Sequence, residues 1–351
     1  MDVSLSSSQV KQKALELGFH KVGIAAVDAN IVSKSVERLQ VWLGNGYQAN
    51  MEWMANPKRQ DIRQVMPSVQ SIITVALNYY TAHQRPEGSQ YGKISRYGWG
   101  RDYHRVMDKK LKLLANWLRS ARGLSFPEHP PMLCAGCDTT GWVLPETTEK
   151  SHSCGVEVRY YADTGPVQDK VWAQAAGIGW IAKNGNVITR EYGSWVFLGE
   201  VLTNIVLTPD GPHTEHCGTC TRCIDACPTG AIAQPFVVDA NRCIAYHTIE
   251  NRVSSLPEEI AGDLEGWVAG CDICQDVCPW NQRFASITDI TEFNPYPENV
   301  APKLSELAKI SDAEWNRRFR ASALRRIKPE MLRRNARANL EADKASAELD
   351  K

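Results

Sequence analysis

Eight of the eleven cysteines in this chain of 351 residues lie between Cys217 and Cys278, and their spacing limits the possible folds more than any other feature. The first run has the spacing C-x2-C-x2-C-x3-C-P and contains Cys217, Cys220, Cys223 and Cys227. Bacterial ferredoxins carry this run, in which three close thiolates bind one iron–sulfur cubane and the fourth binds a neighbouring cluster. A partial second run has the spacing C-x2-C-x3-C-P and contains Cys271, Cys274 and Cys278.

Cys243 lies upstream of the partial run and can supply its missing ligand, so that eight thiolates complete two [4Fe–4S] clusters. We predict that one cluster is bound by Cys217, Cys220, Cys223 and Cys278, and the other by Cys227, Cys243, Cys271 and Cys274. The alternative is a pair of structural zinc sites, because zinc also binds four thiolates. Zinc requires neither this spacing nor crossed ligands, and two adjacent clusters indicate a one-electron relay.

The remaining three cysteines lie in or near a stretch rich in Pro and Gly, residues 123–145. With one histidine they form a candidate third metal site, for which zinc is the best match: Cys134, Cys137, His152 and Cys154. The short His-x-Cys spacing is unusual for zinc. We therefore favour the alternative of three reduced thiols in an exposed loop.

Length and composition predict two or three domains of about 100–200 residues each. Hydrophobic residues make up 43% and charged residues 23%, which excludes collagen-like, coiled-coil and wholly disordered chains. The longest apolar run, residues 72–77, is too short to span a bilayer, and the N-terminus lacks a signal-peptide core. We therefore expect a cytoplasmic protein without a membrane partner, in which cysteines bind metal rather than form disulfides.

The residues before the cysteine runs alternate between helix and strand patterns. Helical spacing of apolar residues recurs over residues 6–17, 31–43 and 102–118, with Asp102 as an N-cap, and residues 21–27, 71–77 and 195–207 favour strands. Such alternation predicts helices packed on a sheet. The predicted fold class is α+β or α/β, with an N-terminal domain (1–208), a ferredoxin-like two-cluster module (209–290) and a helical, Arg-rich segment (291–351). We expect the tail after Asn339 to fray.

Unusual residues of the N-terminal domain concentrate in residues 160–186. Asp163-Thr164-Gly165-Pro166 predicts a turn before a helix over residues 167–176, and an Asp in this setting is more often a helix cap than an acid catalyst. The chain contains neither an Asp-x-His-x-x-Gly element nor a Gly-x-Gly-x-x-Gly dinucleotide fingerprint. The residues alone therefore indicate only a cofactor-binding domain coupled to two clusters.

A series of further motifs, present together and in order over about residues 10–340, resembles epoxyqueuosine reductases, the last enzymes of queuosine tRNA modification. The motifs are Trp53-Met54, Lys58-Arg59, Ser95-Arg96-Tyr97, Gly100-Arg101-Asp102-Tyr103-His104, Asp163-Thr164-Gly165-Pro166, Ala176-Gly177-Ile178-Gly179-Trp180, Lys183-Asn184, Gly193-Ser194, Phe319-Arg320-Ala321-Ser322-Ala323-Leu324 and Arg333-Arg334-Asn335-Ala336. No single motif is decisive, but their joint presence is specific.

This resemblance implies a cobalamin in the N-terminal domain and reduction of epoxyqueuosine to queuosine at the wobble position of the anticodon. It implies three further features: a tRNA partner with a GUN anticodon, an external low-potential electron donor and a monomeric enzyme. Asp163 matches the family's proton donor, and we expect burial to raise its pKa enough to keep it protonated. The positions that match residues near the corrin are Arg59, Ser95, Asp163, Lys183, Asn184, Val187, Ser194 and Leu198.

The net charge of zero hides a strongly basic segment near the C-terminus. Residues 317–337 contain nine Lys or Arg residues and one acidic residue, Glu330, so the other residues together carry −8. A solvated helical face is one interpretation. The density of arginines, with Trp315 and Phe319 nearby, also suits a surface that binds RNA phosphates, and we expect Arg333 and Arg334 to take part.

Two alternative functions compete with the tRNA enzyme. The first is another corrinoid iron–sulfur reductase, such as a reductive dehalogenase acting on a small molecule. The second is a non-catalytic electron carrier or an iron–sulfur protein that binds nucleic acid. Bound cobalamin would exclude the carrier, and binding of an anticodon stem-loop would separate the tRNA enzyme from the dehalogenase.

Overall fold

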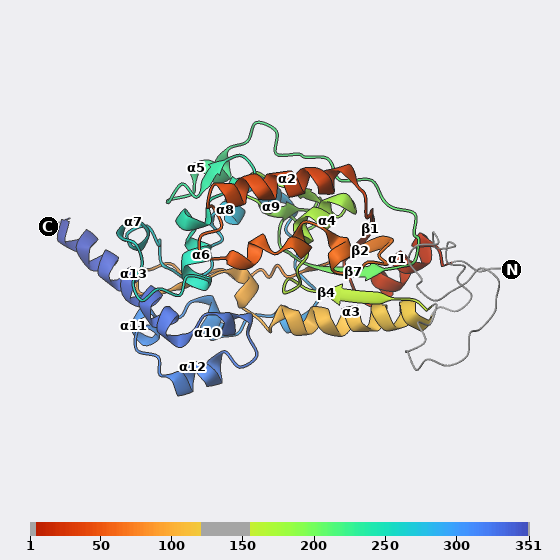
Figure 1. Cartoon of the computed structure of the whole chain (residues 1–351). Coiled ribbons are helices and arrows are strands. Elements are labelled where there is room, and N and C mark those ends of the chain that lie inside the picture. The colour runs from red at the N-terminus through yellow and green to blue at the C-terminus, as the bar shows by residue number, and fades with distance from the viewer. Residues whose placement is uncertain (1–4, 121–154, 350–351) are drawn as a thin grey trace, which may run out of the picture.

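The computed structural model describes residues 5–120 and 155–349 (Figure 1). The candidate zinc ligands Cys134, Cys137, His152 and Cys154 lie outside these residues. No helix in the described ranges is both long and apolar enough to cross a membrane.

A four-stranded sheet forms the centre of the N-terminal part. Its strands lie in the order β1 (Lys21–Ala26), β2 (Ser71–Asn78), β7 (Val196–Thr203) and β4 (Val158–Tyr161). Every neighbouring pair is antiparallel. The α/β form of the predicted fold class implies parallel strands and is wrong for this sheet, whereas α+β describes it. The reason is that the connection from β1 to β2, although it contains a helix, leaves and re-enters the sheet at the same end.

Helices cover both faces of this sheet (Figure 1). On one face, α1 (Ser7–Glu16) and α3 (Tyr103–Ser120) pack against alternate residues of β2, among them Ile73 and Val75. On the other face, α4 (Asp169–Ala175) packs against Ile72, and α2 (Asn30–Gly44) lies over α4. The central strand β2 is buried along its whole length, as its continuous apolar run predicts.

Capping groups explain where two of these helices begin. Ser6 and Gln9 form a reciprocal capping box at the start of α1. Asp102 accepts a hydrogen bond from the His104 backbone N–H at the start of α3, as predicted. Helix α4 begins at Asp169, two residues later than predicted, because the backbone carbonyls of the preceding loop are bound by Arg59.

The remaining elements are short. Outside the sheet, the N-terminal part contains β3 (Lys93–Ile94), β5 (Trp180–Ile181), β6 (Val187–Ile188) and four 3-10 turns, Glu52–Ala55, Pro57–Arg59, Ile62–Gln64 and Arg96–Gly98. The cysteine-rich part contains α5 (Arg222–Asp225), β8 (Ile232–Gln234), β9 (Val237–Val238), Ala240–Arg242, α6 (Ile244–Ile249), α7 (Glu258–Ala261), β10 (Trp267–Ala269), α8 (Ile273–Asp276) and α9 (Pro279–Phe284). The C-terminal part contains Thr291–Phe293, α10 (Pro297–Val300), α11 (Leu304–Leu307), α12 (Asp312–Arg318), Ala323–Arg326 and α13 (Pro329–Leu349).

The three parts of the chain are interleaved rather than strung in sequence. Strand β10 of the cysteine-rich part pairs in parallel with β3 of the N-terminal part. Both strands contribute to the core of the C-terminal helices, where Ile94 and Val268 pack with Phe319. Helix α13 continues to Leu349. Asn339 anchors it, because this residue is buried and its side chain donates to the Trp267 carbonyl, whereas residues 341–345 are mostly exposed.

Candidate redox site and basic surface

The eight clustered cysteines gather into two groups of thiols. Cys223 lies beside Cys220 and Cys278, and Cys217 packs in the same apolar cluster as Cys278. In the second group, Cys274 and Cys271 both neighbour Cys243, and Cys243 neighbours Cys227. Thiols from the two sequence runs therefore lie near one another, and Cys274 neighbours Cys223 of the first group as well as Cys243. The crossed division into two ligand sets remains a prediction.

Burial raises the pKa of six of these thiols, those of Cys217, Cys223, Cys243, Cys271, Cys274 and Cys278. It raises the pKa of Cys217 to about 11, and it raises the pKa values of Cys271 and Cys274 further, with neighbouring thiols adding to the effect. A thiol must lose its proton when it binds iron. Cluster binding would therefore have to supply the free energy needed to deprotonate these buried thiols. Within the described residues, no three Cys, His, Asp or Glu side chains converge closely enough to hold one metal ion. Thiolates of a cubane bind separate irons and need not converge on one point, unlike the ligands of zinc.

A cavity of about 250 Å³ separates the sheet from the second thiol group. Cys271 lines it, so a group bound there would contact a cluster ligand directly. Four of the sequence-predicted corrin residues also line it: Ser95, Val187, Ser194 and Leu198. The wall is completed by polar residues such as Lys170 and Gln275 and by aromatic rings such as Tyr97 and Phe197.

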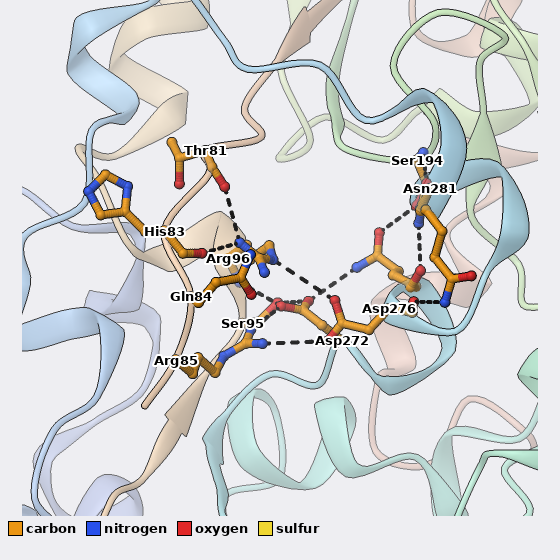
Figure 2. Close-up of polar contacts among 12 residues, drawn as sticks. Thr81, His83, Gln84, Arg85, Ser95, Arg96, Ser194, Asp272, Asp276 and Asn281 are labelled. Carbon is orange, nitrogen blue, oxygen red and sulfur yellow. Dashed lines mark hydrogen bonds and ion pairs between the residues drawn. The ribbon is translucent and has the colours of Figure 1, made fainter. Parts of the chain in front are cut away.

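A buried polar network ties this cavity to the cysteine-rich part (Figure 2). Asp272, which is fully buried between Cys271 and Cys274, accepts hydrogen bonds from the Ser95 hydroxyl and from the Arg96 backbone N–H, the latter at 2.8 Å. It also pairs with Arg85 at 2.5 Å. These hydrogen bonds hold Ser95 in the cavity wall against the loop that carries Cys271 and Cys274.

The other end of the same network holds Ser194 (Figure 2). The Ser194 hydroxyl donates to the Gln275 side chain at 2.8 Å, and the Asn281 side chain donates to that hydroxyl at 2.8 Å. Ser95 and Ser194 therefore line the cavity with their hydroxyl groups already engaged. Their role in the wall is to shape it and to join it to the cluster loops.

Lys183 and Asn184 do not line the cavity, although the resemblance places both near the corrin. The Lys183 ammonium donates to the backbone carbonyls of Gly218 and Cys220, in the latter case at 3.0 Å. The Asn184 amide donates to the Cys274 carbonyl at 3.1 Å. Both side chains thus brace the thiol-bearing loops from the N-terminal part.

Asp163 lies beside the cavity on a loop with an unusual backbone. Its φ is 61°, a left-handed conformation that is uncommon for residues other than glycine. Its carboxylate accepts a hydrogen bond from the Tyr103 hydroxyl at 2.7 Å and lies 3.5 Å from His104 Nε2. Tyr103 in turn stacks on Phe197 of the cavity wall, with ring centroids 4.1 Å apart.

The charge state of Asp163 differs from the sequence-based expectation. Burial acts to raise the pKa of its carboxyl group even though 63% of the side chain is exposed, but the nearby His104 imidazole and the hydrogen bond from Tyr103 outweigh this effect. The net pKa is below the ordinary value, so the expectation of a raised pKa is wrong for this structure. The nearest proton is held by His104: burial lowers its pKa, but Asp102 and Asp163 raise it to about 9.

Arg59 supports the Asp163 loop and does not line the cavity. Its guanidinium donates to the carbonyls of Gly165 at 3.1 Å and Val167 at 2.7 Å, and it lies over the exposed ring of Trp53. Arg59 therefore positions the segment that carries Asp163.

The basic C-terminal segment divides into structural and exposed arginines. Arg334 is buried and donates to the carbonyls of His247, Asn251 and Val253, so its predicted contact with RNA phosphates is wrong. Arg333 binds the Ile310 carbonyl and Asp312. Trp315 and Phe319 are buried in the C-terminal core and cannot stack on bases.

The exposed basic residues of this segment form what we term the basic surface, defined as Arg317, Arg320, Arg325, Arg326, Lys328 and Arg337. Arg326 connects this surface to the candidate site. Its pKa is raised first by Glu250, with which it forms an ion pair, and also by the nearby Asp163 and Tyr103. The positive surface thus reaches the side of the cavity where Asp163 lies.

The sequence motifs contained several of these residues without revealing their roles. Tyr103 and His104 stand in a quoted motif, and only the fold brings them to Asp163, about 60 residues later in the chain. Asp272 lies between two predicted cluster ligands, and this position is the only feature of the sequence that could have marked it as part of the site. Its partner Arg85 lies in an irregular segment with no local motif to identify it.

Comparisons with known proteins agree with this site. A family model described as a 4Fe-4S double cluster binding domain matches residues 216–281, and one described as epoxyqueuosine reductase QueG, DUF1730, matches residues 59–130. The first match favours iron–sulfur clusters over the pair of zinc sites.

Full-length relatives and solved structures point the same way. The epoxyqueuosine reductase of Synechocystis sp. is 56% identical over 320 residues, covering 91% of this chain and 100% of the relative. That of Gloeobacter violaceus is 47% identical over 340 residues, covering 96% of each chain. A crystal structure of epoxyqueuosine reductase with an epoxyqueuosine-modified tRNA-Tyr stem loop has a TM-score of 0.79 and 30% identity, covering 97% of this chain and 82% of that one. At this identity and coverage, the cysteine groups, cavity and Asp163 loop described above are those of a chain that belongs to the epoxyqueuosine reductase family.

Proposed function

We propose that this chain reduces the epoxide of epoxyqueuosine, at the wobble position of a tRNA with a GUN anticodon, to the alkene of queuosine. The reaction adds two electrons and two protons and releases the epoxide oxygen as water. The observation that carries the proposal is one cavity with Cys271 in its wall, Asp163 and His104 beside it, and the basic surface at its edge. Family membership argues against a plain electron carrier, since the relatives are named as reductases.

The eight cysteines are proposed to bind two [4Fe–4S] clusters in crossed sets. Cys217, Cys220, Cys223 and Cys278 bind one, and Cys227, Cys243, Cys271 and Cys274 bind the other. The two thiol groups support these sets, and the proximity of Cys274 to Cys223 keeps the clusters adjacent. Electrons from an external low-potential donor would therefore reach the cavity through the cluster that includes Cys271.

The cavity fits a cobalamin in its chemistry. Apolar side chains such as Val187, Val196 and Leu198 suit the face of a corrin ring, and Lys170 and Asn186 offer polar partners to its amide groups. When bound, cobalamin would supply the low-potential cobalt that delivers electrons to the epoxide. The described cavity would enclose only part of such a group, since its volume is at the small end for ligand sites.

Asp163 and His104 are proposed to deliver the proton to the leaving oxygen. Because the pKa of Asp163 is lowered and that of His104 is raised to about 9, the pair holds one proton at neutral pH, mainly on the imidazole. Asp163 passes this proton to the developing alkoxide, and His104 replenishes it. The second proton, which is needed to release the oxygen as water, reaches the pair from solvent. Tyr103 fixes the carboxylate through its hydroxyl hydrogen bond. General acid catalysis of this kind contributes about 10²–10⁴-fold to a rate.

The tRNA is proposed to bind across the basic surface, with the anticodon loop at the cavity. Arg326 lies near Asp163, and Arg320 and Arg325 are exposed residues of the same basic segment. The proposed enzyme is monomeric and cytoplasmic. Binding through phosphates predicts a steep dependence of affinity on salt.

A direct test is single-turnover reduction of an anticodon stem-loop that carries epoxyqueuosine, followed by mass analysis of its nucleosides. The protein is loaded with clusters and cobalamin and reduced chemically. Asp163→Asn should retain both cofactors and react about 10²–10⁴-fold more slowly. The exposed Asp28, which pairs with Arg63 at the surface, provides the matched control Asp28→Asn. Absence of queuosine with the fully loaded wild type would refute the proposed reaction.

A further inference from the structure

Trp180 presents a buried polar group that the proposed reaction does not use. The residue lies in β5 and is fully buried. Its indole Nε1 makes no regular hydrogen bond with any other described residue. A buried indole N–H normally finds a partner, because leaving it unpaired is unfavourable by about 1–3 kcal/mol. Its surroundings should therefore contain an acceptor of another kind.

The packing around the indole offers the sulfur of Cys217 as an acceptor. Trp180 packs in one apolar cluster with Cys217, Cys278 and Trp280. Burial raises the pKa of the Cys217 thiol to about 11, and hydrogen bonds from the Lys183 backbone N–H and the Trp180 side chain act in the opposite direction. The Lys183 backbone N–H and the Trp180 indole thus both lie near the sulfur of one predicted cluster ligand. A neutral thiol is a weak acceptor, whereas a thiolate bound to iron carries charge and accepts more strongly.

Aromatic rings surround the buried indole. The ring of Trp180 lies 4.7 Å from that of Trp280 and 4.9 Å from that of His216, both in edge-on arrangements. His213 packs against the same indole at 5.2 Å. Cys217 is itself only partly buried, so these rings shield the indole N–H from water without enclosing the whole sulfur. On the shielded side, a fixed N–H dipole has a larger electrostatic effect than it would have at the surface.

We propose that the Trp180 indole N–H donates a hydrogen bond to the Cys217 sulfur and thereby raises the reduction potential of the cluster that this thiolate binds. The inference rests on the iron–sulfur sites of the proposed function and adds a residue that tunes one of them. One-electron reduction adds negative charge to the cluster, and part of this charge resides on the sulfur ligands. A donor aimed at a sulfur stabilises the reduced form more than the oxidised form, so the potential rises.

The test is a redox titration of the holoprotein, monitored by the electron paramagnetic resonance signals of the two reduced clusters. Trp180→Phe removes the N–H and keeps an aromatic ring. We expect the reduced-to-oxidised ratio of one cluster to fall about tenfold at a fixed ambient potential, which corresponds to a midpoint about 59 mV more negative. The midpoint of the other cluster should stay unchanged, because no ligand of that set contacts the indole.

Trp280→Phe is the matched control. Trp280 lies in the same aromatic shell, but its indole N–H donates to the His216 carbonyl at 3.4 Å rather than to sulfur. The control should shift the midpoint by much less. Equal midpoints for wild type and Trp180→Phe, or equal shifts in the two variants, would overturn the proposal.

If Trp180→Phe fails to assemble its clusters, wild-type protein with ¹⁵N-indole tryptophan provides the second measurement. A ¹⁵N hyperfine coupling to the reduced cluster that persists in Trp280→Phe supports the hydrogen bond, and its absence refutes it. These readouts do not involve the epoxide. A protein with intact clusters and the expected potentials that lacks reductase activity would refute the proposed reaction alone.

Discussion

Replacing Asp102 with Asn should shift the pH dependence of epoxide reduction. The protonated form of the His104–Asp163 pair is proposed to be active, so the rate is full below the pKa of the pair and falls as the pH rises through it. Burial lowers the pKa of His104, but hydrogen bonds and charge from Asp102, at 2.8 Å, and Asp163, at 3.5 Å, raise it from 6.5 to about 9. The wild-type rate should therefore decline near pH 9.

The magnitude follows from the two carboxylates. At 1.36 kcal/mol per pKa unit, the rise in the His104 pKa corresponds to at most about 3 kcal/mol, and solvent at the 32% exposed side chain reduces this value. Asp102 is the nearer carboxylate and provides more than half of the rise. Its neutralisation should lower the pKa of His104 by at least about one unit, and the rate at pH 9 should fall at least about fivefold relative to wild type.

The assay is a single-turnover rate measured from about pH 6 to pH 10 with chemically reduced enzyme, so that electron supply does not limit the rate. Asn retains the side-chain oxygen that caps α3 through the His104 backbone N–H, which keeps the helix start intact. The rate near pH 6 should match wild type, since His104 remains protonated there. An unchanged alkaline limb in Asp102→Asn would refute the role of His104 as the proton source.

Three further perturbations test the stability and binding arguments. Asp272→Asn removes the buried partner of Arg85 and should lower the free energy of unfolding by about 3 kcal/mol, measured by chemical denaturation of the holoprotein at neutral pH; a loss below 1 kcal/mol would contradict the importance of the network. Burial and the neighbouring Asp169 raise the pKa of Glu200 well above its ordinary value, so the folded state retains a proton that the unfolded state loses above about pH 4.5, and wild-type stability should fall as the pH rises from 5 to 8. Glu200→Gln should flatten that decline in denaturant midpoints, and an equal decline in both proteins would exclude a raised pKa. Replacing Arg320 and Arg325 with Gln should reduce the slope of log affinity for the anticodon stem-loop against log salt by about 1.5–2, whereas an unchanged slope would place the RNA elsewhere.

Several features of this protein could be predicted from sequence because short stretches of chain determine them. The cysteine spacing predicted the double-cluster domain, because the short turns between the cysteines bring several thiols close together. The continuous apolar run of β2 predicted a strand buried on both faces. The Ser-rich start and apolar periodicity of α1 predicted that helix, because its cap and its buried face are local properties.

Other features depended on contacts between distant residues. Arg333 and Arg334 are adjacent in a basic run, yet α13 directs Arg334 into buried carbonyl groups, where its charge is unavailable to RNA. Asp163 has a lowered pKa because the fold places Tyr103 and His104 against it, and no local pattern could reveal those donors. The antiparallel sheet likewise depends on how β1, β2 and β7 pair across long connections.

The sequence by itself thus determined the double-cluster domain, most of the main secondary structure and the family. Only the tertiary structure decided which polar side chains meet, and therefore where protons reside and which arginines face solvent. The physical reason is that thiolate ligation and helix or strand formation depend on neighbours along the chain. The charge state of a side chain depends on partners and burial, which arise only when remote segments pack together.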